Sequence, residues 1–379
     1  MKLPKLLQNK IDNRINNNAL RTLKKQSILV DFASNDYLGF SKNENIFHKA
    51  HELLIQKKAT QNGATGSRLL SGNHFLYEET ESFIAQFHQS ESALIFNSGY
   101  DANIGLFSSV PQRNDIVLYD EFSHASIRDG IQMSLAKSYK FKHNDLNDLE
   151  KLLQRFENKL SEIYIVTESV FSMDGDSPDI LKLANLSEKH NALLIIDEAH
   201  SLGVFGDKGQ GLVQELTLQD KVFARIMTFG KGLGCHGAAI LGSKKLKEYL
   251  INFSRSFIYT TALPPHSIAT ILIAYQELEK NQEKIKKLQE NSLFFNQNIS
   301  SIFNSTNYNS SIKSIIISGN ERVKNASIYL NNKGFDVKPI LSPTVSEGQE
   351  RLRFCLHSYN SKEEIKEALL SLEKHLINT

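Results

Sequence analysis

Two residues that follow successive apolar runs could carry chemistry in this sequence, Asp197 and Lys231. Asp197 directly follows the run Leu193–Ile196, and Lys231 stands between Gly230 and Gly232 after the next strand-like run. A carboxylate at the exit of a buried strand needs a cation or a hydrogen-bond donor. A lysine flanked by glycines can approach a ligand closely and offer an amine to an aldehyde. Together the pair indicates a pyridoxal phosphate site, where an acid keeps the ring nitrogen protonated and a lysine holds the aldehyde carbon.

Each of these residues alone also has an ordinary explanation. Asp197 with His200 fits a helix cap beside a surface histidine equally well, and most lysines are solvated. The combination favours a site, because both residues follow neighbouring strands.

Two other polar segments could complete such a site. Ser98, Gly99 and Tyr100 lie between the run Ala93–Phe96 and an expected helix, whose first N–H groups can bind a phosphate. His124 follows another apolar run and is expected to stack on the cofactor ring or to transfer protons, although a loop histidine with local contacts would look the same.

The segment that must position these residues extends from about residue 75 to 245. Short apolar runs alternate there with segments of helical period, which predicts an α/β domain with a mostly parallel sheet. Four runs are followed directly by polar residues, and ligands of such sheets bind at the carboxyl ends of strands. These runs are Ala93–Phe96, Asp115–Tyr119, Ile163–Val166 and Leu193–Ile196, with further strands expected at Phe223–Met227 and Ala238–Leu241.

A second, smaller domain is expected towards the C-terminus. A long helix from about Ser267 to Phe295 leads into strands at Ser314–Ile317 and Leu352–Leu356, with helices around Ser327 and Lys362. We therefore expect three parts: an N-terminal segment (1–45), a large cofactor-binding α/β domain (46–270) and a C-terminal α+β domain (271–379).

Composition excludes several other classes of protein. The 379 residues are 40% hydrophobic and 23% charged with a net charge of +2, which argues against disorder and against nucleic acid as a partner. The N-terminus lacks the apolar stretch of a signal peptide, and no run approaches the ~20 residues of a membrane span. Two distant cysteines fit a reducing compartment, so we expect a cytoplasmic protein.

Two apparent motifs are rejected. Gly232–Gly237 matches the dinucleotide pattern GxGxxG, but a strand and not a helix is expected after it. Asp174–Asp179 begins like a calcium loop, but position six is Asp179 and position twelve is Asn185 where glycine and glutamate are required. No metal site is predicted.

Six segments occur in the order found in one family. The chain resembles the α-oxoamine synthases, pyridoxal phosphate enzymes of fold type I with the aspartate aminotransferase fold, from about residue 19 to 358. The segments are Ser34–Gly39, Ser98–Tyr100, His124–Ser126, Phe171–Gly175, Asp197–His200 and Thr228–Lys231.

The resemblance implies a PLP-dependent acyltransferase. The segment Arg255–Pro265 and the lack of extensions resemble the members that condense L-alanine with a pimeloyl thioester in biotin biosynthesis, with loss of CO2. It implies Lys231 as the cofactor-holding base, Asp197 as the ring-nitrogen partner and His124 as the stacking group. The other implied cofactor contacts are Ser98, Gly99, Tyr100, Ser172, His200 (also in the catalytic set), Thr228 and, across a homodimer interface, Thr261.

Substrate contacts follow from the same resemblance. Arg353 is the implied clamp on the amino-acid carboxylate, a role that suits a bidentate guanidinium. Asn35, His124, Arg21 and Thr344 are the other implied contacts, the last two with the thioester, whose carrier is coenzyme A or an acyl carrier protein. Sister enzymes such as glycine C-acetyltransferase or serine palmitoyltransferase, and a non-catalytic paralogue, are the alternatives.

Overall fold

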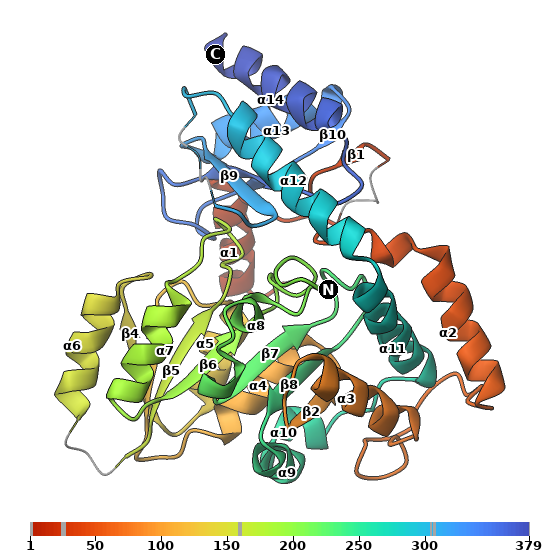
Figure 1. Cartoon of the computed structure of the whole chain (residues 1–379). Coiled ribbons are helices and arrows are strands. Elements are labelled where there is room, and N and C mark those ends of the chain that lie inside the picture. The colour runs from red at the N-terminus through yellow and green to blue at the C-terminus, as the bar shows by residue number, and fades with distance from the viewer. Residues whose placement is uncertain (1–2, 24–27, 158–160, 304, 306–307, 379) are drawn as a thin grey trace. The chain divides into compact units, whose positions relative to one another are not determined.

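The computed structural model describes residues 3–23, 28–157, 161–303, 305 and 308–378 (Figure 1). The expected N-terminal segment, 1–45, thus includes positions 1–2 and 24–27, which lie outside the described residues. The chain divides into a larger unit, residues 35–172 and 176–286, and a smaller unit, residues 1–34, 173–175 and 287–379.

The larger unit is built on a seven-stranded sheet of order β2-β8-β7-β6-β5-β3-β4. β8 is antiparallel to both of its neighbours, and the other strands all run in one direction. The strands are β2 (Ser92–Phe96), β3 (Ile116–Asp120), β4 (Lys137–Phe141), β5 (Ile163–Glu168), β6 (Leu193–Asp197), β7 (Ala224–Thr228) and β8 (Ala238–Gly242). The predicted mostly parallel α/β sheet is therefore present, and β8 is the strand expected after the glycine-rich segment.

Alternate residues of the central strands enter two separate apolar clusters. Val166 and Ile195 pack with residues of the helices α4 (Gly99–Ser109), α5 (Ala125–Met133) and α9 (Lys244–Phe253). Ile165 and Leu194 pack with residues of α6 (Leu146–Phe156) and α7 (Ile180–Lys189). Because both faces of the sheet are covered, the strands read as uninterrupted apolar runs. The helices of this unit are η1 (Phe40–Lys42), α2 (Glu44–Gln56), α3 (Leu76–Phe87), α4 (Gly99–Ser109), α5 (Ala125–Met133), α6 (Leu146–Phe156), α7 (Ile180–Lys189), α8 (Leu212–Glu215), η2 (Gln219–Lys221), α9 (Lys244–Phe253), α10 (Arg255–Ile258) and α11 (Pro265–Lys280).

The prediction of a single helix from Ser267 to Phe295 is wrong, because two helices, α11 and α12 (Gln282–Asn298), meet at Asn281. The Asn281 side chain donates to the carbonyl of Glu277 at 3.0 Å and to its carboxylate at 2.7 Å. Such bonds satisfy acceptors that the last turn of a helix leaves open, so α11 can end there.

The smaller unit contains an antiparallel sheet of order β11-β12-β9 and a parallel pair, β1 with β10. Its strands are β1 (Val30–Asp31), β9 (Ile312–Ile316), β10 (Phe335–Asp336), β11 (Lys338–Ile340) and β12 (Arg351–Cys355), and its helices are α1 (Lys5–Asn16), most of α12, α13 (Asn320–Asn332) and α14 (Lys362–Ile377). Strands and helices expected in the C-terminal part are thus confirmed as β9, β12, α13 and α14. Within the described part of the chain, no helix is both long and apolar enough to cross a membrane.

A buried ion pair fixes the turn that follows β6. Arg225, on β7, donates from Nε to Glu198 Oε2 at 2.7 Å, and both side chains are at most 3% exposed. Glu198 also accepts hydrogen bonds from the Ser201 hydroxyl and the Val213 N–H group. The pair therefore ties the segment after Asp197 to the neighbouring strand.

Removing the cation should destabilise the larger unit strongly. We expect Arg225→Ala to lower the free energy of unfolding by about 3–5 kcal/mol, because it leaves the Glu198 carboxylate buried without a counter-charge. Urea unfolding measures the change, with Arg113→Ala, at an exposed arginine, as the control. A loss below about 1 kcal/mol, the range of exposed pairs, would contradict this role.

Candidate active site

Three neighbouring strands end at one edge of the large sheet. Glu168 ends β5, Asp197 ends β6 and Thr228 ends β7, and the register pairs Glu168 directly with Asp197. Lys231 follows three residues after β7, in the turn before β8. The parallel register thus brings the expected acid and the expected lysine to the same sheet edge, where ligands of α/β proteins bind.

Lys231 belongs to a chain of hydrogen bonds. Its Nζ lies 2.8 Å from His200 Nε2, His200 Nδ1 lies 2.7 Å from the Tyr37 hydroxyl, and this hydroxyl donates to Asn35 Oδ1 at 3.3 Å. With Lys231 as the donor, His200 carries its proton on Nδ1 and donates to Tyr37. The lysine amine is therefore held by a defined acceptor. Tyr37, which has no role assigned by the sequence, sets the tautomer.

Asp197 is 5% exposed and is connected to His124 through two polar side chains. Its two oxygens accept hydrogen bonds from Asn103 Nδ2 and from the Ala199 N–H group, both at 2.9 Å. Asn103 Nδ2 also donates to Ser126 Oγ at 3.0 Å, and Ser126 Oγ lies 2.7 Å from His124 Nδ1. Asn103 and Ser126 thus orient both the acid and the histidine.

The imidazole of His124 is held in the neutral form. The N–H group of Ser126 donates to Nδ1 at 3.2 Å, which leaves the ring proton on Nε2. Burial lowers the pKa of His124, and the Lys231 charge acts in the same direction, although the charge of Asp197 raises it. His124, Asp197 and Lys231 are therefore close enough to influence one another electrostatically.

The start of α4 lies against the end of β7. A Cβ atom at Gly99 would stand 2.5 Å from Thr228 Oγ1, so this approach requires glycine. The Ser98 hydroxyl accepts from the N–H group of Asp101 at 3.1 Å and begins the helix. The first N–H groups of α4 and the Thr228 hydroxyl can therefore bind an anion. The side chain of Tyr100 is half exposed and donates to Asp129, at 2.7 Å.

The other residues that the sequence predicts as cofactor or substrate contacts lie partly in the larger unit and partly in the smaller unit. In the larger unit, Ser172 is partly buried in the turn after β5, and the carbonyl of the exposed Thr261 accepts from Asn97 at 2.7 Å. In the smaller unit, Arg21 donates to Thr344 Oγ1 at 3.2 Å although the two residues are 323 positions apart, and Arg353 lies on β12. The two implied thioester contacts are therefore neighbours.

Glu168 is a residue of the site whose role the sequence did not reveal. It is fully buried, and burial, together with the negative charge of Asp197, raises its pKa to about 8. Its Oε1 accepts the N–H group of His124 at 2.6 Å. Its place at a strand end is the same signal that identified Asp197, so it could have been found.

The raised pKa of Glu168 makes the stability of the larger unit depend on pH. The contribution of the protonated carboxyl is complete below its ordinary pKa of 4.5 and is lost as the pH rises through about 8. Glu168→Gln keeps the acceptor for His124 but cannot ionise. As the pH rises from about 6 to about 9, the free energy of unfolding of the variant should therefore increase relative to the parent by at least about 1 kcal/mol. A pKa shift of one unit would already give more than this amount.

Thermal unfolding of the ligand-free proteins across this pH range tests the expectation. Glu162→Gln, at an exposed glutamate just before β5, is the control and should follow the parent. Parallel stability profiles for Glu168→Gln and the parent would show that Glu168 is ionised throughout.

Comparisons with known proteins identify the family of the chain. The model of the family described as "Aminotransferase class I and II" matches residues 27–372. An 8-amino-7-oxononanoate synthase of Emericella nidulans is 40% identical over 358 residues, which cover 89% of this chain and 86% of that protein.

Solved structures of two enzymes share the fold of nearly the whole chain. A serine palmitoyltransferase of Sphingomonas wittichii has a TM-score of 0.89 at 25% identity and covers 99% of this chain and 98% of its own. An 8-amino-7-oxononanoate synthase of Francisella tularensis has a TM-score of 0.79 at 30% identity, with coverages of 93% and 99%. The expected fold-type I architecture is confirmed, and the chain belongs to the aminotransferase class I and II family and, within it, to the α-oxoamine synthases.

Proposed function

We propose that this chain is an 8-amino-7-oxononanoate synthase that uses pyridoxal 5'-phosphate. It would condense L-alanine with a pimeloyl thioester of coenzyme A or of an acyl carrier protein, releasing CO2 and the free thiol carrier, in biotin biosynthesis. The observation that carries the proposal is the 40% identity to the enzyme of that name over 89% of this chain. A cytoplasmic homodimer is the expected form.

The residues at the sheet edge fit this cofactor. The two recorded partners of the buried Asp197 carboxylate, an amide and a backbone N–H group, carry no charge. A buried carboxylate without a counter-charge is costly, and a protonated pyridine nitrogen would supply one. A Cβ atom at Gly99 would collide with the Thr228 hydroxyl, so glycine keeps this hydroxyl beside the first N–H groups of α4, which can bind a phosphate group.

Each residue of the site then has a defined task. When bound, pyridoxal phosphate supplies an electron sink for negative charge at the α-carbon of an amino acid. Lys231 would hold the cofactor and afterwards take the α-proton at Nζ, with His200 as its hydrogen-bond partner. Asp197 would keep the ring nitrogen protonated, and His124 would lie along the ring. Ser98, Gly99, Tyr100, Ser172 and Thr228 would complete the cofactor site, with Thr261 from a second copy.

Four residues outside the cofactor site are proposed as substrate contacts. Arg353 would bind the carboxylate of alanine in two parallel hydrogen bonds, as a guanidinium can. Arg21 and Thr344, which are hydrogen-bonded to each other, would contact the thioester. Asn35 would contact the amino-acid substrate.

The decisive assay combines purified protein with pyridoxal phosphate, L-alanine and pimeloyl-CoA and determines the product by mass spectrometry. We expect the mass of 8-amino-7-oxononanoate. L-serine with a long-chain acyl-CoA is the second combination, because a structure with a TM-score of 0.89 is a serine palmitoyltransferase. Turnover of L-serine or glycine without turnover of alanine would contradict the proposal and assign a sister reaction.

The charge of Asp197 should matter more than its shape. Asp197→Asn keeps side-chain size but loses the negative charge, so we expect kcat to fall about 10- to 100-fold, as for loss of one charged hydrogen bond. Steady-state kinetics measures this, and Asp207→Asn, at an exposed aspartate, is the matched control. Equal kcat values for Asp197→Asn and the parent would remove Asp197 from the site.

A further inference from the structure

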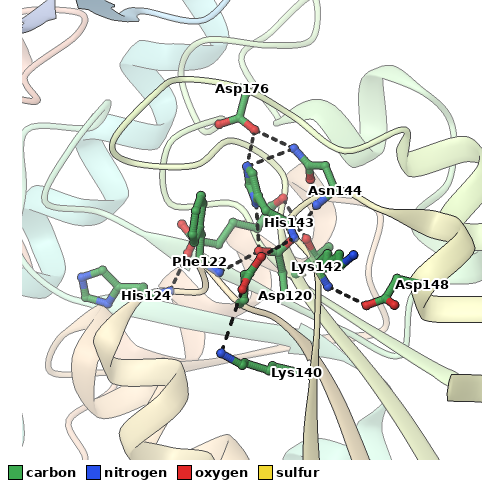
Figure 2. A network of polar contacts seen from close by, with 12 residues as sticks. Asp120, Phe122, His124, Lys140, Lys142, His143, Asn144, Asp148 and Asp176 are labelled. Atoms are coloured by element: carbon green, nitrogen blue, oxygen red, sulfur yellow. Dashed lines mark hydrogen bonds and ion pairs between the residues drawn. The ribbon is translucent and has the colours of Figure 1, made fainter. Parts of the chain in front are cut away.

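His143 is clamped between two carboxylates outside the residues described so far (Figure 2). It lies between β4 and α6, with Nδ1 2.9 Å from Asp120 Oδ1 and Nε2 2.7 Å from Asp176 Oδ2. Burial alone would lower the pKa of His143, but the hydrogen bonds with Asp120 and Asp176 raise it to about 10. Both ring nitrogens therefore donate, and the ring is an imidazolium.

One of the two carboxylates, that of Asp120, holds the segment that leads to His124 through hydrogen bonds. Asp120 is fully buried at the end of β3 and accepts the N–H groups of Phe122, at 2.8 Å, and Asn144, at 2.9 Å, in addition to His143. The carbonyl of Asp120 accepts the N–H group of Ser123 at 3.0 Å. The chain from β3 to His124 is therefore held to the segment after β4.

The other residue, Asp176, holds the turn after β5 through hydrogen bonds. Asp176 Oδ2 accepts from Asn144 Nδ2 at 2.5 Å as well as from His143. The carbonyl of Asp176 accepts the N–H group of Phe171 at 2.9 Å, which fixes the residue directly before Ser172. His143 and Asn144 thus connect the two segments that carry His124 and Ser172.

Two aromatic rings enclose the imidazolium. Phe122 stacks on His143 with centroids 4.5 Å apart at 30°, and Phe171 meets it edge-on at 4.5 Å and 88°. A cation over an aromatic face is attracted to it, so Phe122 adds to the clamp. Phe122 is itself 57% exposed, and it lies two residues before His124.

We propose that His143 is a positioning residue of this enzyme, which fixes the segments of His124 and Ser172 and thereby the orientation of His124 along the cofactor ring. The inference rests on the proposed function, because only a bound cofactor gives the His124 orientation a consequence. His143 itself touches neither cofactor nor substrate in this account. It acts through Asp120, Phe122 and Asp176.

The test compares His143→Gln with His190→Gln in the full-length protein. His190 is another buried histidine of the larger unit, at the end of α7, and has no connection to either segment among the contacts of the described residues. Four quantities are measured well below the unfolding temperature of each variant: the dissociation constant of pyridoxal phosphate, the visible circular dichroism of the bound cofactor at saturation, kcat, and KM for the acyl thioester.

For His143→Gln we expect cofactor circular dichroism reduced by at least half and kcat reduced at least about 10-fold, since small displacements of catalytic groups have effects of this size. The dissociation constant should rise about 10-fold, and KM for the thioester should stay within about 3-fold, because Arg21 and Thr344 lie in the smaller unit. His190→Gln should match the parent in all four quantities.

Phe122→Leu serves if His143→Gln does not fold, because it removes the stacked ring without leaving a buried charge unpaired. It should lower the circular dichroism signal and kcat about 2- to 5-fold, in line with the strength of a cation–π contact. Parental dichroism and kcat in the folded variants would overturn the positioning role alone. Absence of any cofactor signal in the parent protein would overturn the proposed function as well.

Discussion

The parallel register of β5, β6 and β7 is the constraint on which the site depends. Both faces of these strands are buried in apolar clusters, so a slip of one residue would exchange the residues of the two faces. The register that avoids this pairs Glu168 with Asp197 at one sheet edge. The same hydrophobic burial that stabilises the larger unit therefore sets the spacing of its acids, and the turn after β7 adds Lys231 to them.

The buried carboxyl groups at this edge of the large sheet differ in what balances their negative charge. Glu198 is neutralised by Arg225, and the two carboxylates beside His143 share its positive charge. Glu168, with its pKa raised to about 8 by burial and by Asp197, holds its proton at neutral pH. Asp197 accepts hydrogen bonds from a side-chain amide and a backbone N–H group of the described residues, and both donors are uncharged. This difference marks Asp197 as the acid with capacity for a cationic ligand, and the surrounding pairs keep the segments beside it in place.

The sequence predicted most strands of the larger unit because burial on both faces produces uninterrupted apolar runs. It missed β4, an edge strand whose residues Lys137–Phe141 are mostly exposed and carry no such run. It also missed the helix break at Asn281, which depends on local side-chain bonds to Glu277. The roles of Asn103 and Ser126 were missed for another reason, although Ser126 belongs to one of the six segments. Both are ordinary polar residues inside helices, and their roles exist only through contacts with Asp197 and His124.

Among the lysines of this protein, we expect Lys231 to be the amine that reacts with the cofactor aldehyde. Lys313, on β9 of the smaller unit, is the alternative to exclude, because burial lowers its pKa to about 7 and such an amine could also react with an aldehyde. The direct measurement is borohydride reduction of the protein with pyridoxal phosphate, followed by peptide mass mapping. We expect the cofactor on the peptide that contains Lys231. A stoichiometric label on Lys313, with Lys231 unmodified, would contradict it.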